Sequence, residues 1–148
     1  MAGSGIARMR IDAWMTRTVK TVKPMDTLAH AREVMVENRI NQLPVVAKGK
    51  LAGIITDRDL RDAYPSALAG GQASELEEAR VESVMTANVL ILGPEDPLVR
   101  AAELMRAERI GAVPVVEKDH LVGVVTRSDI LRAFVSLSQS EATGHTST

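Results

Sequence analysis

The sequence predicts an α/β (α+β) protein made of two copies of a β-α-β-β-α unit, with its sheets flanked by helices. Three observations support this prediction: a motif that occurs twice, apolar spacing that switches between strand and helix periods, and a globular composition. The stretch GIITDRDL, Gly53 to Leu60, returns as GVVTRSDI, Gly123 to Ile130. Each copy starts with the apolar run of a buried strand and continues as a helix.

The duplication extends well beyond this motif. Met15-Thr16 recurs as Met85-Thr86, an offset of 70 residues, and the same offset carries PVV at 44–46 to PVV at 114–116. About 19 of the 47 positions from 14 to 60 are identical to their partners, with no gap. Self-similarity at one fixed spacing indicates an internal repeat. We therefore expect a first repeat over 12–64, a linker over 65–80 and a second repeat over 81–137.

The first half of each repeat contains a short strand and a helix. The strands are expected at 19–22 and 89–92, where a proline soon follows. Asp26 and Asp96 then stand where a helix N-cap is expected, because a carboxylate accepts hydrogen bonds from free N–H groups. Leucine, alanine and methionine follow at helical spacing, so Met35 and Met105 are predicted to face the core.

The second half of each repeat contains two apolar strands and a helix. In the first repeat the strands are expected at 43–46 and 51–55, around a turn that contains Gly49. The second helix starts after Thr56, or after Thr126 in the second repeat. This last helix is apolar nearly all round, so it needs cover on more than one side. A second copy of the chain, in a homodimer, is expected to provide part of that cover.

The segments outside the repeats differ in composition. Residues 1–11 begin with small side chains and are expected to be flexible, and 138–148 is expected to be a disordered tail. In the linker, Gly70-Gly71 indicates a break in structure. Ser74 and Glu77 follow at the spacing of a capping box, which predicts a short acidic helix.

Composition excludes several classes of function. The chain has 148 residues, 45% of them hydrophobic, and no cysteine, which rules out disulfides and thiol catalysis. Its net charge of −1 disfavours a broad basic face for nucleic acid. No apolar run reaches the roughly 18 residues of a membrane helix, and no signal peptide is recognisable, so a cytoplasmic location without membrane contact is expected. The three histidines have no partners at triad or metal-ligand spacing, so no catalytic residue or metal ligand is predicted.

The repeated Thr-x-x-Asp has two compatible interpretations. As a capping box, threonine starts the helix and the acid three residues later completes the cap, with no ligand involved. As a binding motif, the helix start offers N–H groups to an anion, and the aspartate accepts hydrogen bonds from ribose hydroxyls. Phosphate beside the helix start and ribose on the aspartate together describe a nucleotide.

The full pattern resembles a known family. The residues that carry the resemblance read MT…P-x-x-x-L-x-x-A…R-I-x-x-x-P-V-V…L-x-G…T-x-x-D in both repeats. This is similar to the cystathionine β-synthase (CBS) domain, present as a tandem pair or Bateman module, as in stand-alone bacterial two-CBS-domain proteins. The resemblance covers about residues 12–137. It implies repeats related by a pseudo-twofold axis, and a non-catalytic regulatory module with two clefts that bind AMP, ADP or ATP.

The resemblance also implies the residues that line each cleft, with threonine and aspartate at phosphate and ribose and the segments of the other repeat around adenine. One cleft would combine Thr126, Ser128 and Asp129 with Thr16 to Val19 and Ile40 to Leu43. The other would combine Thr56, Arg58 and Asp59 with Thr86 to Val89 and Ile110 to Val113. Ile54 and Val124 would lie against the base.

Two side chains could make the clefts unequal. Arg58 stands where the second repeat has Ser128, and a guanidinium binds phosphate well. We therefore expect the Thr56/Asp59 cleft to prefer polyphosphates, unless Arg58 is only a solvated surface residue. Asp57, Asp59 and Asp62 could hold Mg²⁺ beside a nucleotide through water, although a solvated acidic face is the more common role of such residues.

Three alternatives for function remain at this stage. The first is the nucleotide-binding module, which needs no cofactor and acts on a separate, unidentified protein. The second is an oligomeric scaffold in which Thr-x-x-Asp only caps helices, independently of any ligand. The third keeps the clefts but assigns them another ligand, such as S-adenosylmethionine, NAD, guanosine or a dinucleoside polyphosphate.

Overall fold

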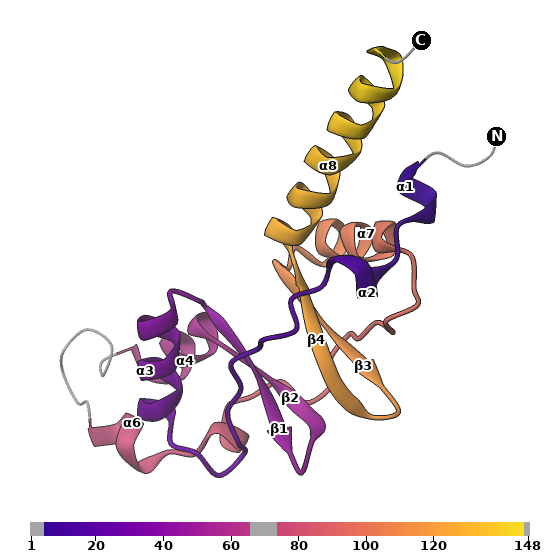
Figure 1. The fold of residues 1–148 in the computed structure, drawn as a ribbon. Coiled ribbons are helices and arrows are strands. Elements are labelled where there is room, and N and C mark those ends of the chain that lie inside the picture. Colours follow the sequence, from indigo (N-terminus) through magenta and orange to yellow (C-terminus); the bar gives the residue numbers. More distant parts are fainter. Residues whose placement is uncertain (1–4, 66–73, 147–148) are drawn as a thin grey trace. The chain divides into compact units, whose positions relative to one another are not determined.

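The computed structural model of the chain describes residues 5–65 and 74–146 (Figure 1). The chain divides into two compact units. Unit 1 contains Met1–Val19, Leu90–Lys118 and Val122–Thr148, and unit 2 contains Lys20–Val89 and Asp119–Leu121. The units therefore do not coincide with the sequence repeats, because the segment that opens each repeat belongs to the unit that holds the helices of the other repeat.

Unit 2 is built around one helix and one hairpin. Its elements are α3 (Leu28–Asn38), β1 (Gln42–Ala47), β2 (Lys50–Thr56), α4 (Asp57–Ala63), α6 (Ser74–Glu78) and the 3₁₀ turn η1 (Val81–Ser83). The strands are antiparallel and the register runs from Gln42 opposite Thr56 to Ala47 opposite Lys50. Lys48 and Gly49 both have positive φ, 55° and 82°. A two-residue turn with this backbone matches the twist of the strands it joins.

The core of unit 2 is aliphatic. Leu28, Ala31 and Met35 recur at helical spacing on α3 and are buried against Leu43, Val45 and Ile55 of the hairpin. Leu76 of α6 and Val81 close the same cluster. The predicted core role of Met35 is therefore confirmed, and the short acidic helix predicted after Ser74 is present as α6. Gly70-Gly71 lies outside the described residues.

Unit 1 repeats this plan, with the N-terminal segment in the place that α6 and η1 take in unit 2. Its elements are α1 (Gly5–Arg8), α2 (Ile11–Trp14), α7 (Leu98–Glu108), β3 (Ala112–Glu117), β4 (His120–Thr126) and α8 (Arg127–Thr146). β3 and β4 are hydrogen-bonded neighbours. The start of β4, His120, is part of unit 2, where it pairs with Lys50. The described helices and strands confirm the predicted mixture of short strands flanked by helices.

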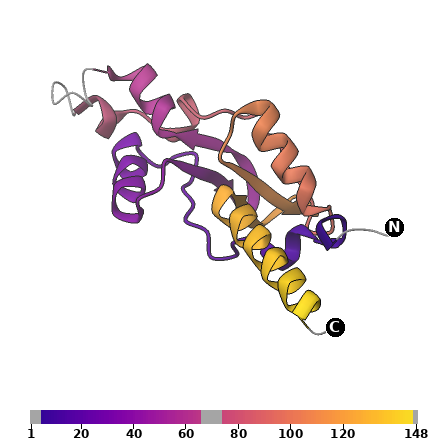
Figure 2. The same ribbon diagram turned by 90° about the horizontal axis from the view of Figure 1, so that it is seen from above.

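The end of the N-terminal segment is packed at Met9 and Ile11, within the range where flexibility is expected. Ile11 is completely buried beside Leu98, Met105 and Val125. Its N–H donates to the carbonyl of Asp96, and the N–H of Leu98 donates to the carbonyl of Met9. Figures 1 and 2 show α1 and α2 beside α7 and α8. The apolar side chains of Met9 and Ile11 explain the packing, and residues 1–4 lie outside the described part.

The expected first strands are shorter than predicted. Val22 forms one parallel bridge with Val45, and Leu92 forms the equivalent bridge with Val115. The N–H of Val22 donates to the Pro44 carbonyl and the N–H of Leu92 to the Pro114 carbonyl, each at a distance of 3.1 Å. Pro24 and Pro94 come two residues later and lack the N–H that a longer ladder needs, so the pairing stops after one bridge.

The expected N-caps are displaced by one residue. Asp26 accepts a hydrogen bond from the N–H of Lys23 at 2.8 Å, and Asp96 accepts one from Gly93 at the same distance. These aspartates therefore close turns ahead of the helices. Thr27 is the N-cap of α3 and accepts from the N–H of His30, because it lies one residue closer to the helix. Pro97 occupies that position before α7, without a side-chain hydrogen bond.

Helix α8 is longer than predicted. It continues to Thr146, so residues 138–146 are helical where a disordered tail is expected. No proline follows Phe134, and glutamate and alanine favour helix, so the helix propagates once its first turns are packed. Ala133 anchors these turns in the core. No helix among the described residues combines the length and apolar character needed to cross a membrane.

Candidate functional site

In both units a Met-Thr segment lies across the strand that carries Thr-x-x-Asp. In unit 1, Thr16 and Val124 exchange two backbone hydrogen bonds of 2.8 and 2.9 Å. In unit 2, Thr86 and Ile54 do the same at 2.8 and 2.9 Å. Each pair brings a segment of one sequence repeat onto a strand of the other repeat.

The glycine of the repeated motif makes this crossing possible. A Cβ on Gly123 would lie 2.9 Å from the Thr16 carbonyl oxygen and 2.8 Å from the Met15 sulfur. On Gly53 it would lie 2.6 Å from the Thr86 carbonyl oxygen. Such distances leave no room for a side chain. These glycines therefore allow a close approach of backbone to backbone.

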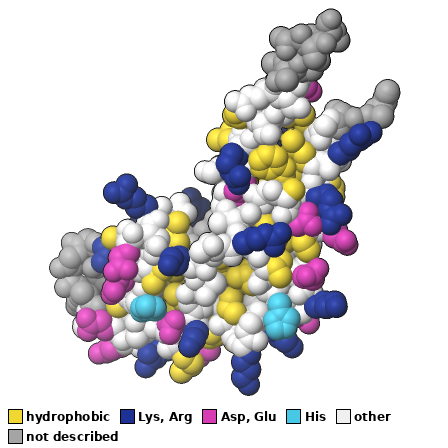
Figure 3. Space-filling model, in the orientation of Figure 1, with side chains coloured by type: hydrophobic (Ala, Val, Ile, Leu, Met, Phe, Trp, Pro, Cys, Tyr) yellow, Lys and Arg dark blue, Asp and Glu magenta, His cyan; other side chains and the backbone are white. Residues whose placement is uncertain are grey.

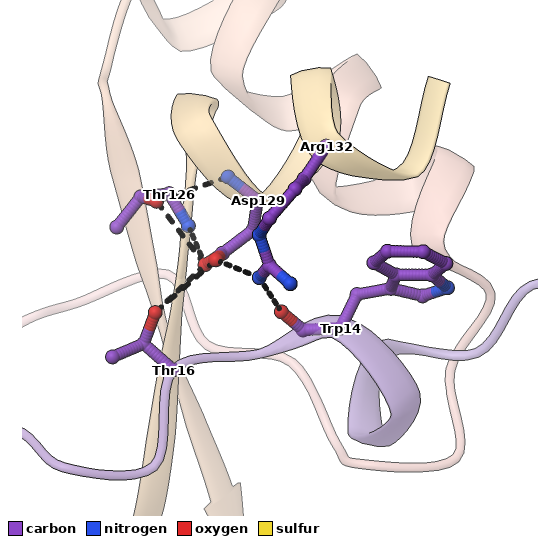
Figure 4. Close-up of polar contacts among 5 residues, drawn as sticks. All are labelled: Trp14, Thr16, Thr126, Asp129 and Arg132. Atoms are coloured by element: carbon purple, nitrogen blue, oxygen red, sulfur yellow. Dashed lines mark hydrogen bonds and ion pairs between the residues drawn. The ribbon is translucent and has the colours of Figure 1, made fainter. Parts of the chain in front are cut away.

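Asp129 is the centre of the polar cluster in unit 1 (Figure 4). Its carboxylate accepts hydrogen bonds from the Thr126 N–H at 2.8 Å and the Thr126 hydroxyl at 3.1 Å. The Thr16 hydroxyl lies 3.1 and 3.2 Å from its two oxygens. Only 3% of Asp129 is exposed, so these donors replace solvent around a buried charge.

Arg132 completes the cluster. Its guanidinium donates to the Asp129 carboxylate at 2.7 Å and to the Trp14 carbonyl at 3.0 Å. The same group lies over the Trp14 ring, with Cζ 5.5 Å from the centroid, in the geometry of a cation–π contact. The Arg132 side chain is 60% exposed, so it covers the Asp129 carboxylate on the side that faces solvent.

The equivalent residues of unit 2 form a simpler arrangement. Asp59 accepts from the Thr56 N–H at 2.9 Å, and the Asp59 N–H donates to the Thr56 hydroxyl at 3.0 Å. This reciprocal pair is a complete capping box at the start of α4. Among the described residues, no other donor reaches the Asp59 carboxylate. The capping interpretation of Thr56-x-x-Asp59 is thus confirmed, and it leaves the carboxylate largely free.

The charged neighbours of this motif face outward. Arg58 is exposed. Asp57 forms an ion pair of 3.2 Å with Arg61, one turn further along α4. Within 5–65 and 74–146, no group of three or more histidine, aspartate or glutamate side chains is arranged to hold a metal ion. In this part of the chain, Asp57, Asp59 and Asp62 do not form a preformed metal site, and Mg²⁺ binding there stays a prediction.

The remaining predicted ligand residues are distributed over both units. Val19, Ile54, Val89, Ile110 and Val124 are half-buried, Ser128 is exposed, and Ile40 is 37% exposed. Leu43 and Val113 are completely buried in the two cores, so their side chains are committed to packing. Ile40 and Leu43 belong to unit 2, whereas Asp129 belongs to unit 1. Their joint role in one cleft stays a prediction, as does that of Ile110 and Val113 with Asp59.

Sequence reasoning missed Trp14 and Arg132. Arg132 follows Asp129 by three residues in a predicted helix, a spacing at which opposite charges meet. That signal was therefore present in the sequence. Trp14 carries no comparable signal, because its contact with Arg132 joins residues 118 positions apart.

A comparison with family models identifies the chain. The model of the CBS domain matches twice, over residues 10–66 and 81–136. The chain belongs to the CBS-domain family. Both matches include the Thr-x-x-Asp motif, so each repeat is a CBS domain and the chain contains a CBS pair. The resemblance seen in the sequence is confirmed.

Three relatives with similar sequences differ in length. A CBS domain-containing protein of Dictyostelium discoideum is 40% identical over 129 residues, which cover 83% of this chain and 89% of that protein. Protein MJ1225 of Methanocaldococcus jannaschii is 35% identical over 130 residues, 84% of this chain. The chain spans only 46% of MJ1225. Homoserine O-acetyltransferase of Methanohalobium evestigatum, 33% identical over 80% of this chain, is matched over 22% of its own length.

A solved structure connects this fold with a ligand. CBSX2, a CBS-pair protein of Arabidopsis thaliana, was crystallised in complex with AMP. It is 27% identical to this chain with a TM-score of 0.76, over 88% of this chain and 98% of CBSX2. A nucleotide is therefore bound by a protein of the same fold and nearly the same extent.

Proposed function

We propose that the chain is a regulatory module without catalytic activity, which binds adenine nucleotides (AMP, ADP or ATP) at its Thr-x-x-Asp motifs and signals to a separate protein. The observation that carries the proposal is the matching construction of the two units. In each, a Met-Thr segment crosses the strand ahead of Thr-x-x-Asp, beside a carboxylate. The AMP complex of CBSX2, which has this fold, supports the choice of ligand.

The roles of the residues follow from their chemistry. Asp59 and Asp129 would accept hydrogen bonds from the ribose hydroxyls, as acidic residues do in dinucleotide sites. Thr56, Thr126 and Ser128 offer hydroxyl donors for phosphate, and Arg58 offers a charged donor. Ile54 and Val124 supply half-buried apolar surface for the base. Mg²⁺, where it takes part, would accompany the phosphates of ATP.

Signalling requires that the nucleotide prefers one of two conformations of the module. A ligand shifts such an equilibrium only by its difference in affinity for the two states. The separate protein that the module regulates would then bind the favoured state. In this proposal the protein target is regulated by contact, and the module itself performs no reaction.

Thermal melting of the purified protein tests the proposal. AMP, ADP and ATP at about 100 times their dissociation constants should add about 2.7 kcal/mol of stability, or about 5–11 °C for a chain near this size. Asp59→Ala and Asp129→Ala should each reduce the nucleotide-induced shift in melting temperature, by the share that the removed site contributes. NAD, S-adenosylmethionine and GTP serve as competing ligands in the same assay. A shift that is equal in the wild type and in the Asp59→Ala/Asp129→Ala double variant would contradict binding at these motifs.

A ligand-independent scaffold is the second candidate, and the surface of α8 favours it. Leu131, Phe134 and Val135 are 64%, 60% and 52% exposed, and Figure 3 shows hydrophobic side chains along this helix. A groove of about 480 Å³ lies between α7 and α8, beside Leu131, and is bordered by Arg106, Arg109 and Arg127. A homodimer through α8 would cover this surface. Melting that no nucleotide affects, in a protein that is dimeric in solution, would favour the scaffold over the sensor.

A further inference from the structure

The two aspartates of the Thr-x-x-Asp motifs differ in how many of their acceptor positions are taken. A carboxylate offers about four lone-pair positions to donors. Asp129 is contacted by the Thr126 N–H and hydroxyl, the Thr16 hydroxyl and Arg132. In the described part of the chain, the Asp59 carboxylate accepts one hydrogen bond, from the Thr56 N–H. A ribose diol brings two new donors, for which Asp59 has room and Asp129 does not.

Part of this difference comes from the hydroxyls of Thr16 and Thr126, and part from the residue three positions after each aspartate. Arg132 follows Asp129, and Asp62 occupies the same position after Asp59. Asp62 carries the opposite charge and cannot donate to a carboxylate. The guanidinium of Arg132 also donates to the Trp14 carbonyl and lies over the Trp14 ring, so three contacts hold it in place.

We propose that Arg132 is a latch on the ribose position of the second motif. While it is closed, Asp129 is occupied by the protein's own side chain, and ribonucleotide fills the Asp59 site first. Binding at Asp129 requires that Arg132 leaves the carboxylate, which also changes its contact with Trp14. This inference rests on the proposed nucleotide-binding function and adds an order of filling to it.

The latch predicts a change in nucleotide affinity opposite in sign to the change that simple electrostatics predicts. Arg132→Met removes a positive charge beside an anionic ligand, which by charge alone would weaken binding. With the latch removed, the acceptor position that Arg132 occupies becomes free for a ribose hydroxyl, and binding should strengthen. The Arg132 side of this ion pair is open to solvent, so we use the upper value for surface ion pairs, about 1 kcal/mol, which corresponds to about fivefold in affinity. Methionine keeps most of the aliphatic length of arginine, so contacts made by the stem are preserved.

Calorimetric titration with AMP separates the two sites. The Asp59→Ala variant leaves only the Asp129 site, and adding Arg132→Met to it should tighten AMP binding about fivefold. Arg132→Lys keeps the charge and should restore much of the weaker binding. The matched control is Asp62→Arg in the Asp129→Ala variant. It installs a latch beside Asp59 and should weaken AMP binding although it adds a positive charge.

Two further measurements distinguish a latch from a general structural effect. 2′-Deoxy-AMP lacks one of the hydroxyls that compete with Arg132, so Arg132→Met should improve its binding less than that of AMP. Trp14 is the single tryptophan of the chain, so its fluorescence reports on this position directly. In the Asp59→Ala variant, AMP should change the Trp14 emission in step with binding. With Arg132→Met added, the emission should be altered before AMP is present and respond little to it.

The outcomes separate the latch from the underlying function. AMP binding that is unchanged or weaker in Arg132→Met, in a variant with wild-type circular dichroism, overturns the latch and leaves nucleotide binding intact. Weaker binding in that variant would show that the positive charge of Arg132 favours the ligand more than its contact with Asp129 opposes it. If neither the wild type nor any variant binds AMP, the proposed function fails, and the latch fails with it.

Discussion

Replacing Gly123 with alanine should destabilise unit 1 strongly. The added methyl group would lie 2.9 Å from the Thr16 carbonyl oxygen, which is backbone and cannot move aside alone. Overpacking of this kind costs about 1–3 kcal/mol. Displacing Thr16 also weakens its two hydrogen bonds to Val124, each contributing about 0.5–1.5 kcal/mol. With some relaxation, we expect a loss of about 2–4 kcal/mol in the free energy of unfolding.

Thermal unfolding followed by circular dichroism measures this loss. A chain of this size should show a melting temperature lowered by about 4–16 °C. Gly93→Ala is the matched control, because its methyl group would meet only the Asp96 carboxylate, at 3.7 Å. Gly93→Ala should therefore melt close to the wild type or slightly above it. A Gly123→Ala protein that melts within about 2 °C of the Gly93→Ala control, which is less than the smallest expected shift of about 4 °C, would refute the steric reasoning.

Two other variants test local features of the structure. Thr56→Ala removes the side-chain acceptor of the capping box on α4 and should cost about 1 kcal/mol, or about 2–4 °C, whereas Thr56→Ser should restore most of it; equal melting of the alanine and serine variants would show that the cap contributes nothing. Phe134→Ser on the exposed face of α8 should leave the far-ultraviolet spectrum unchanged but shift the protein toward monomer in light scattering, if α8 forms a homodimer contact; an unchanged mass would exclude Phe134 from such a contact.

Local sequence signals predicted much of the secondary structure. The offset of 70 residues correctly anticipated that α7 and α3 have the same length and that both carry a buried methionine. The two-residue turn at Lys48-Gly49 followed from its glycine, and α6 from its capping-box spacing. These features depend on neighbours within one or two turns, which a single sequence displays directly. The position of the N-cap at Thr27 shows the limit, because Asp26 offers the same chemistry one residue earlier.

The candidate site was only partly predictable. The role of Thr56 and Asp59 as a cap followed from their spacing. The clustering of Thr16 with Asp129 depends on how segments 113 residues apart pack, and no local pattern encodes that. The same reason explains why the expected strand at 89–92 is reduced to one bridge, since its partner Val115 and the nearby Pro94 decide how far pairing extends.

The arrangement of the N-terminal segment affects the order in which the protein can fold as it is synthesised. Residues 5–19 leave the ribosome before the rest of the described chain, yet the unit they complete includes α8, which is synthesised more than 100 residues later. Until then, Ile11 and Met15 have no finished core to enter. Unit 2 draws on residues 20–89, apart from three residues near 120, so most of it can form earlier. A nascent chain should therefore acquire protease resistance first in unit 2, and in residues 5–19 only after α8 has emerged.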